Sequence, residues 1–100
     1  MSEKNELLDL AYIIMHPVRR EIVELLRTSS LYISEIARLL DISEKLASFH
    51  LATLLQYELV KGEWKALNPE KGAPKMVKYY SLTQKAENVI KSIGEWVLDE

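Results

Sequence analysis

Residues 34–57, SEIARLLDISEKLASFHLATLLQY, decide the fold class of this 100-residue chain. Apolar residues at helical spacing predict a short helix over about 35–40. Three residues follow, and the same spacing then predicts a second, longer helix over about 44–57. Two helices joined by three residues have the spacing of a helix-turn-helix, which we expect over 35–57.

Helices are also expected on both sides of this motif. Apolar stripes predict an amphipathic helix over about 6–15 and a final helix over about 84–98. Pro17 is expected to begin a helix that runs to about 27, because proline is well tolerated in the first turn. Three hydroxyl residues are suited to cap the later helices. They are Ser34, Ser43 and Thr83.

The pattern changes to that of strands after Glu58. Residues 59–67 and 75–83 are rich in strand-forming residues, and the segment 68–74 between them contains two prolines and a glycine. A hairpin is therefore expected over 59–83, and residues 31–33 are expected to add a brief edge strand. The predicted class is mainly α with a small β-hairpin (α+β), in the order α-α-β-α-α-β-β-α.

Length and composition exclude several classes of protein. One hundred residues with 48% hydrophobic content predict one folded domain over 1–100. The chain has no cysteine, which removes disulfides, thiolate metal ligands and cysteine nucleophiles. The longest apolar run, Leu10 to Met15, is far too short to span a membrane. We therefore expect a soluble protein with a cytoplasmic location.

The charge is unevenly distributed along the chain. The formal net charge is −2, but residues 59–80 contain five lysines and two glutamates, a net charge of +3. The remainder of the chain is therefore acidic. A basic hairpin on an acidic body favours an anionic partner at one edge of the molecule, although lysines on a hairpin are also typical of an ordinary solvated surface.

Four stretches of the sequence together resemble the ArsR/SmtB-type family of prokaryotic transcription regulators. They are HPVRREIVELL over 16–26, ISEIARLLDIS over 33–43, SFHL over 48–51 and YYSLT over 79–83. The resemblance covers about residues 6–93. It implies a winged helix-turn-helix fold and a homodimer, with the second helix of the motif in the DNA major groove and the hairpin, the wing, along the flanking backbone.

The second helix of the motif has the residues from which DNA contacts are expected. On a helical wheel Ala47, Leu51 and Leu54 face inward, so Lys45, Phe49, Ala52 and Gln56 face outward. The candidate DNA-binding residues here are Ser43, Glu44, Lys45, Ser48, Phe49 and Gln56. The resembled family often has basic residues where Phe49, Ala52 and Leu55 stand. Phe49 is thus a candidate for a thymine methyl contact, for a contact with a protein partner, or for packing within the fold.

The hairpin supplies the remaining candidate DNA contacts. Its lysines can neutralise phosphates, which adds affinity that depends on salt but not on sequence. They are Lys61, Lys65, Lys71, Lys75 and Lys78. Trp64 lies among them, and it is expected to pack on the domain rather than stack on a sugar or base, because large aromatic side chains usually bury most of their area.

The first and last helices are candidates for a dimer interface. Both are amphipathic, and neither is needed to complete the helix-turn-helix. The candidate interface residues are Leu7, Leu10, Ile14, Ile93, Trp96 and Val97. The alternative is that these stripes only cover the core of one protomer.

No catalytic or cofactor motif is present in the sequence. The only histidines are His16, a candidate helix cap, and His50, a candidate structural residue, and they have no metal-ligand spacing. We therefore expect no metal, no cofactor and no enzymatic activity. The leading hypothesis is a homodimeric, sequence-specific DNA-binding regulator. The alternatives are a winged-helix module that binds a protein through Phe49, and a sensor with a small ligand in the dimer groove.

Overall fold

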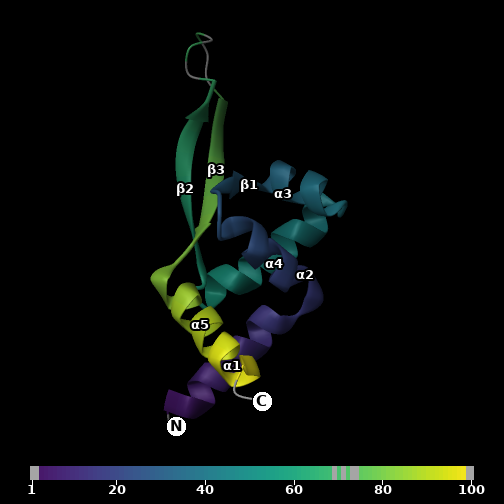
Figure 1. The fold of residues 1–100 in the computed structure, drawn as a ribbon. Helices are drawn as coiled ribbons and strands as arrows, with labels where there is room; N and C mark the ends of the chain where they lie inside the picture. The colour runs from purple at the N-terminus through teal and green to yellow at the C-terminus, as the bar shows by residue number, and fades with distance from the viewer. Residues whose placement is uncertain (1–2, 69, 71, 73–74, 99–100) are drawn as a thin grey trace.

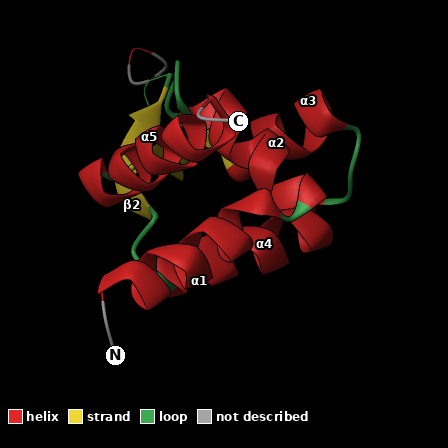
Figure 2. Ribbon diagram, turned by 60° about the horizontal axis from the view of Figure 1, so that its bottom comes forward, coloured by secondary structure: helices red, strands yellow, loops and turns green. Residues whose placement is uncertain are grey.

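The described residues form five helices and three strands in the predicted order (Figure 1). The structure is a computed structural model that describes residues 3–68, 70, 72 and 75–98. Its elements are α1 (Glu3–Met15), α2 (Pro17–Leu26), β1 (Leu31–Tyr32), α3 (Ile33–Leu40), α4 (Glu44–Gln56), β2 (Val60–Leu67), β3 (Lys75–Leu82) and α5 (Gln84–Leu98). The α+β class is therefore confirmed. Figure 2 shows that helices make up most of the molecule and that the strands lie to one side.

Three helices have the polar N-cap side chain that the sequence predicts. The amide of Val18 donates to Nδ1 of His16 (3.2 Å), directly before Pro17 in the first turn of α2. Ser43 Oγ accepts from the amide of Leu46 (3.0 Å) at the start of α4. Thr83 Oγ1 accepts in the same way at the start of α5. These bonds satisfy amides that have no partner within their own helix.

The predicted cap at Ser34 is wrong. Helix α3 begins at Ile33, and Tyr32 is its N-cap. The amide of Tyr32 donates to Oε1 of Glu35 (3.2 Å), so a carboxylate in the first turn caps the helix. Tyr32 also pairs with Tyr79 in the sheet, which holds its backbone extended up to the helix start. Ser34 is consequently an exposed residue of the first turn.

The three strands form one antiparallel sheet in the order β1-β3-β2. β2 and β3 pair from Val60 opposite Leu82 to Leu67 opposite Lys75, and β1 pairs with Tyr79 and Tyr80 of β3. The expected hairpin and edge strand are thus confirmed. The expected hairpin loop lies partly outside the described residues.

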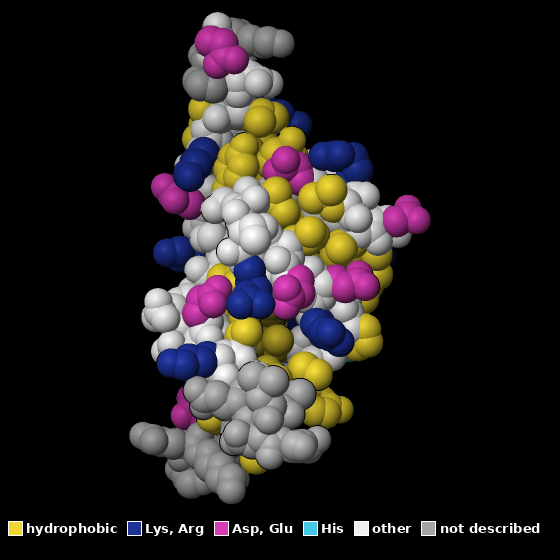
Figure 3. Space-filling model, in the orientation of Figure 1, with side chains coloured by type: hydrophobic (Ala, Val, Ile, Leu, Met, Phe, Trp, Pro, Cys, Tyr) yellow, Lys and Arg dark blue, Asp and Glu magenta, His cyan; other side chains and the backbone are white. Residues whose placement is uncertain are grey.

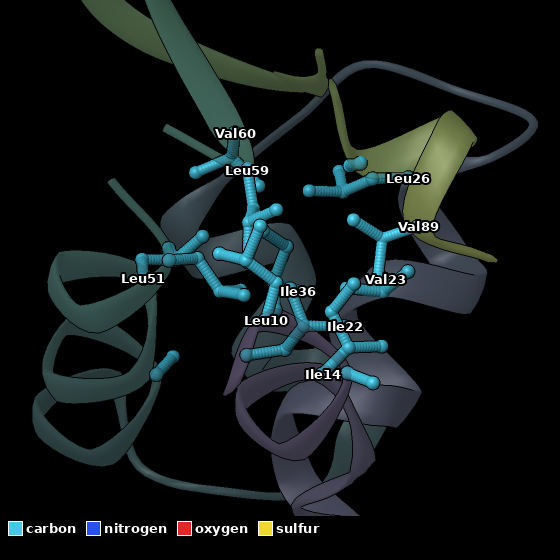
Figure 4. Packing of buried hydrophobic residues seen from close by; sticks show 14 of the residues in the cluster. Leu10, Ile14, Ile22, Val23, Leu26, Ile36, Leu51, Leu59, Val60 and Val89 are labelled. Atoms are coloured by element: carbon cyan, nitrogen blue, oxygen red, sulfur yellow. The ribbon is translucent and has the colours of Figure 1, made fainter. Parts of the chain in front are cut away.

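The core lies where all five helices meet the base of the hairpin (Figure 4). Each helix contributes buried side chains, and the first strand of the hairpin adds Val60 directly after Leu59. Labelled examples from the helices are Leu10, Ile22, Ile36, Leu51 and Val89. This shared core fixes α4 relative to both the hairpin and the terminal helices. Within the described ranges, no helix combines the length and the hydropathy that a membrane span requires.

Candidate nucleic-acid interface

The turn between α3 and α4 is built by Asp41 and Ser43. Asp41 ends α3 in the left-handed region (φ 54°), a conformation that aspartate adopts more readily than most residues. The amide of Ile42 then donates to the carbonyl of Ala37 (3.0 Å), which closes the helix end. Ser43 caps α4 one residue later. The three-residue connection predicted from the sequence therefore has a defined geometry.

Helix α4 has the two faces that the helical wheel predicts. Ala47, Leu51 and Leu54 are buried against the core. The six candidate contacts of this region are all exposed, and they lie at the cap and along the outer side of the helix. These residues are Ser43, Glu44, Lys45, Ser48, Phe49 and Gln56. The exposed N-terminal half of α4 thus contains polar side chains, Phe49 and a single cation, Lys45.

Phe49 is exposed rather than packed within the fold. Its side chain is 63% exposed, and its ring meets His50 edge-on with 5.2 Å between centroids. Leu46 on the same helix and Leu39 on α3 are also exposed. Of the three alternatives for Phe49, packing within the fold is therefore not supported, and both DNA contact and protein contact remain compatible with this position.

Arg19 and His50 form a buried polar contact that connects α4 to the start of α2. Arg19 is 9% exposed and His50 is 4% exposed. Arg19 Nε donates to the carbonyl of Ile13 (2.6 Å), and Nη1 lies 3.2 Å from Nδ1 of His50. Because a guanidinium only donates, Nδ1 accepts and the imidazole carries its proton on Nε2. Arg19 is not among the residues predicted from the sequence, although its position three and four residues before Ile22 and Val23 places it on the buried face of α2.

The surroundings of His50 favour its neutral form. Burial lowers the pKa of His50 below 6.5, and the nearby His16 and Arg19 lower the pKa further. The ring centroids of His16 and His50 are 4.6 Å apart. Within the described residues, no group of three or more His, Asp or Glu side chains is arranged to hold a metal ion.

The candidate lysines of the hairpin lie on both of its faces. Side chains alternate along a strand, and the register places Lys61 and Lys65 opposite Ser81 and Val77 on one face. Lys78 lies on the other face, opposite Trp64. Lys61, Lys65 and Lys75 are exposed, and Lys78 is half-buried with Nζ 5.7 Å from the centroid of the Tyr80 ring. Lys71 lies outside the described residues.

Trp64 is exposed, contrary to expectation. Its side chain is 63% exposed, although it lies on the same face of β2 as the buried Val60. The reason is that Val60 is the only residue of β2 that is buried in the core, and the hairpin continues from there beyond the helices (Figure 1). On the face in Figure 3, hydrophobic side chains gather beside the hairpin, with charged residues of both signs around them.

Two candidate dimer residues are buried inside the protomer. Leu10 and Ile14 belong to the core, because α1 packs against α2 and α5, whereas Leu7 and Ile93 are partly buried around it. For Leu10 and Ile14 the alternative of a core role is thus supported. The side chains of Trp96 and Val97 lie outside the described part of α5. The outward side of α1 has an exposed apolar stripe at i, i+4 and i+7, formed by Leu8, Tyr12 and Met15.

A helix-turn-helix with an exposed second helix, followed by a two-stranded wing, defines a winged helix-turn-helix protein. Residues 16–61 match the family described as bacterial regulatory protein, arsR family. The chain is therefore an ArsR-type winged helix-turn-helix protein in residues 16–61, the part that matches this family of regulatory proteins. This confirms the resemblance stated from the sequence.

Solved structures support the same fold. The chain is similar to HlyU from Vibrio cholerae N16961, with 19% identity over 96% of this chain and 97% of that chain and a TM-score of 0.72. It is similar to the C30S mutant of Lactococcus lactis ZitR, with 30% identity over 79% of this chain and 50% of that chain and a TM-score of 0.62. The chain is also similar to wild-type Lactococcus lactis ZitR in complex with DNA, with 28% identity over 74% of this chain and 47% of that chain and a TM-score of 0.58. A search of curated proteins found no match.

Proposed function

We propose that this protein is a sequence-specific transcription regulator that binds duplex DNA as a homodimer. In this proposal α4, the recognition helix, enters the major groove, and the wing (β2, β3 and their loop) follows the flanking backbone. The observation that carries the proposal is the exposed N-terminal half of α4, with Glu44, Lys45 and Ser48 beside Phe49, on a helix whose inner stripe is fixed in the core. Base contacts in helix-turn-helix proteins come from this part of the helix.

The candidate residues have complementary roles in this proposal. Lys45 and Ser48 are placed to meet base edges or phosphates, and Phe49 is placed to contact a thymine methyl. The exposed wing lysines add phosphate contacts, which compensate for a recognition helix with one cation. The complex of ZitR with DNA supports duplex DNA as the partner. A protein that binds chromosomal DNA acts in the cytoplasm of a prokaryote.

The terminal helices supply the dimer interface in this proposal. The stripe of Leu8, Tyr12 and Met15 is the exposed apolar surface of α1, and Leu7 and Ile93 lie partly exposed at the edge of the core. We include Trp96 and Val97 of α5 from the sequence pattern. A two-fold axis beside these helices would present two recognition helices to adjacent turns of one DNA face.

A titration of pooled random duplex DNA at several salt concentrations tests this function. The protein is first characterised by sedimentation, so that the binding species is known. Binding at low salt that weakens steeply as salt rises is the expected result, because lysine–phosphate contacts release counterions. Absence of binding at low salt would rule out the proposal.

The exposure of Phe49 favours one other function. A recognition face with Phe49 and Leu46 exposed and one cation suits a protein partner as well as DNA. Phe49→Asp separates the two functions. Loss of duplex affinity in this variant supports DNA binding, whereas unchanged duplex affinity together with loss of a co-purifying protein supports the interaction module.

A further inference from the structure

An open groove separates the wing from the helix-turn-helix. Its volume is about 400 Å³. Trp64, Tyr80, Lys75 and Lys78 line it from the wing, and Ser34 and Glu44 line it from the first turns of α3 and α4. We call this cavity the wing groove. It is continuous with the recognition helix, because Glu44 is the first residue of α4.

The indole of Trp64 is available to a ligand in the wing groove. Trp64 shares its strand face with Val60, whose side chain enters the core, so Trp64 lies on the helical side of the hairpin. An indole buries a large apolar area when it finds a partner, and its 63% exposure leaves most of that area unused within the protomer. Met76, on the same face of β3, is exposed as well.

One lysine on the face of Trp64 gives the wing groove a charge that suits a nucleic-acid strand. Lys78 lies opposite Trp64 in the register, whereas Lys75 is exposed at the start of β3 and pairs with Leu67 on the other face of the hairpin. The Lys78 side chain crosses β2 at Gly62, where an added Cβ would collide with it, and its ammonium lies over the Tyr80 ring. Gly62 thus allows Lys78 to lie beside the indole. Glu44, on the opposite wall, disfavours a phosphate at that side.

We propose that the wing groove holds one strand of duplex DNA and that Trp64 packs against a deoxyribose of that strand. This inference rests on the proposed DNA-binding function. A phosphate beside the sugar would meet Lys78, while the sugar supplies the apolar surface that an indole requires. Apolar side chains also contact DNA in proteins that bind the minor groove, where they add contact that lysines alone do not give.

The salt dependence of duplex binding distinguishes this contact from a phosphate contact. Trp64→Ala is expected to lower the association constant by about tenfold at every salt concentration, the scale of one aromatic contact to a nucleotide. The slope of log K against log salt should stay unchanged, because the indole has no charge. Trp64→Phe is the matched control, and it should retain most of the affinity. Unchanged unfolding midpoints will show that both variants are folded.

Fluorescence gives an independent readout. Trp96→Phe leaves Trp64 as the only tryptophan of the chain, and this variant is used once its sedimentation and duplex affinity match those of the unsubstituted protein. Duplex DNA is expected to quench or shift its emission, whereas heparin, a polyanion without deoxyribose, should bind the lysines and leave the emission nearly unchanged. An equal response to heparin would contradict the proposal, because the indole would then report on charge neutralisation alone.

The outcomes separate this inference from the function on which it rests. If the unsubstituted protein binds no duplex DNA, the proposed function fails. If it binds duplex DNA and Trp64→Ala binds equally tightly, the groove contact is wrong while the function stands. A variant that loses affinity only through a smaller salt slope would also overturn the proposal, since Trp64 would then act merely by placing Lys78.

Discussion

Arg19 and His50 connect the recognition helix to the junction of α1 and α2. Arg19 contacts the carbonyl of Ile13 at the end of α1 and the imidazole of His50 on α4. Both side chains are buried, so loss of either partner would leave a polar group without its hydrogen bond. This pair therefore fixes the rotation of α4 that presents Phe49 and Ser48 outward.

The same contact predicts that stability depends on pH. The pKa of His50 in the fold is below its unfolded value of 6.5, so between these two values the unfolded chain binds more protons. The contribution of the neutral imidazole is complete above about pH 6.5 and is lost as the pH falls through the folded pKa. We expect the urea midpoint to decrease between pH 7.5 and 5.5.

His50→Gln provides the control for this prediction. Its amide oxygen can still accept from Arg19 but does not titrate in this range. The variant should show a smaller decrease of the midpoint between pH 7.5 and 5.5 than the unsubstituted protein. Identical decreases in both proteins would show that His50 is not the group responsible.

At the scale of elements, Thr83 connects three parts of the fold. It lies between the wing and α5, and it contacts Glu58, which follows the recognition helix. Its hydroxyl donates to the carbonyl of Glu58 (2.8 Å) and accepts from the amide of Ala86 (3.2 Å). Thr83→Ala should lower the free energy of unfolding by about 1 kcal/mol, the usual cost of a lost N-cap. Chemical denaturation measures this change, and Thr83→Ser should recover most of it. A Thr83→Ala variant of unchanged stability would contradict this role.

The number of phosphate contacts from the wing should be measurable from the salt dependence of duplex binding. Lys75→Ala and Lys78→Ala are each expected to reduce the salt slope of duplex binding by roughly one unit, because each removed contact releases about one counterion fewer. Lys91, exposed on α5, provides the control, and Lys91→Ala should leave the slope unchanged. Equal slopes in all three variants would remove the wing from the binding mode.

The elements could be predicted from local patterns, whereas their contacts could not. Apolar spacing and the caps at Ser43 and Thr83 are properties of short segments, and these predictions are confirmed. The start of α3 was misplaced because Tyr32 is held by a strand distant in the sequence. Trp64 was misjudged for a similar reason, since its exposure depends on how far the hairpin extends beyond the body. The Arg19–His50 contact depends on three helices packing together.

At the scale of the whole molecule, the charge distribution and the elongated shape both favour the wing as the edge that binds DNA. The net charge of −2 combines a wing segment of +3 with an acidic remainder, so we expect DNA to be attracted to the wing and repelled elsewhere. The molecule is elongated, with a longest extent of 54 Å. Binding is therefore expected to be confined to one edge and to weaken strongly with salt.

Dimerisation should depend on the outer stripe of α1. Tyr12 is 80% exposed at the centre of this stripe, so Tyr12→Asp should shift the protein to monomers without loss of the protomer fold. Duplex affinity should decrease with it, because a monomer contacts one half-site. Sedimentation equilibrium measures the assembly state. A variant that dimerises as tightly as the unsubstituted protein would place the interface elsewhere.

The most direct test of a homodimer with α4 in the major groove is selection of binding sites from a pool of random duplexes. Two recognition helices related by a two-fold axis predict an enriched inverted repeat whose half-site centres lie about 10 bp apart. Phe49→Asp should change or abolish the enriched half-site. Enrichment of a single unrepeated site, or no enrichment from a pool that the protein binds, would contradict the account.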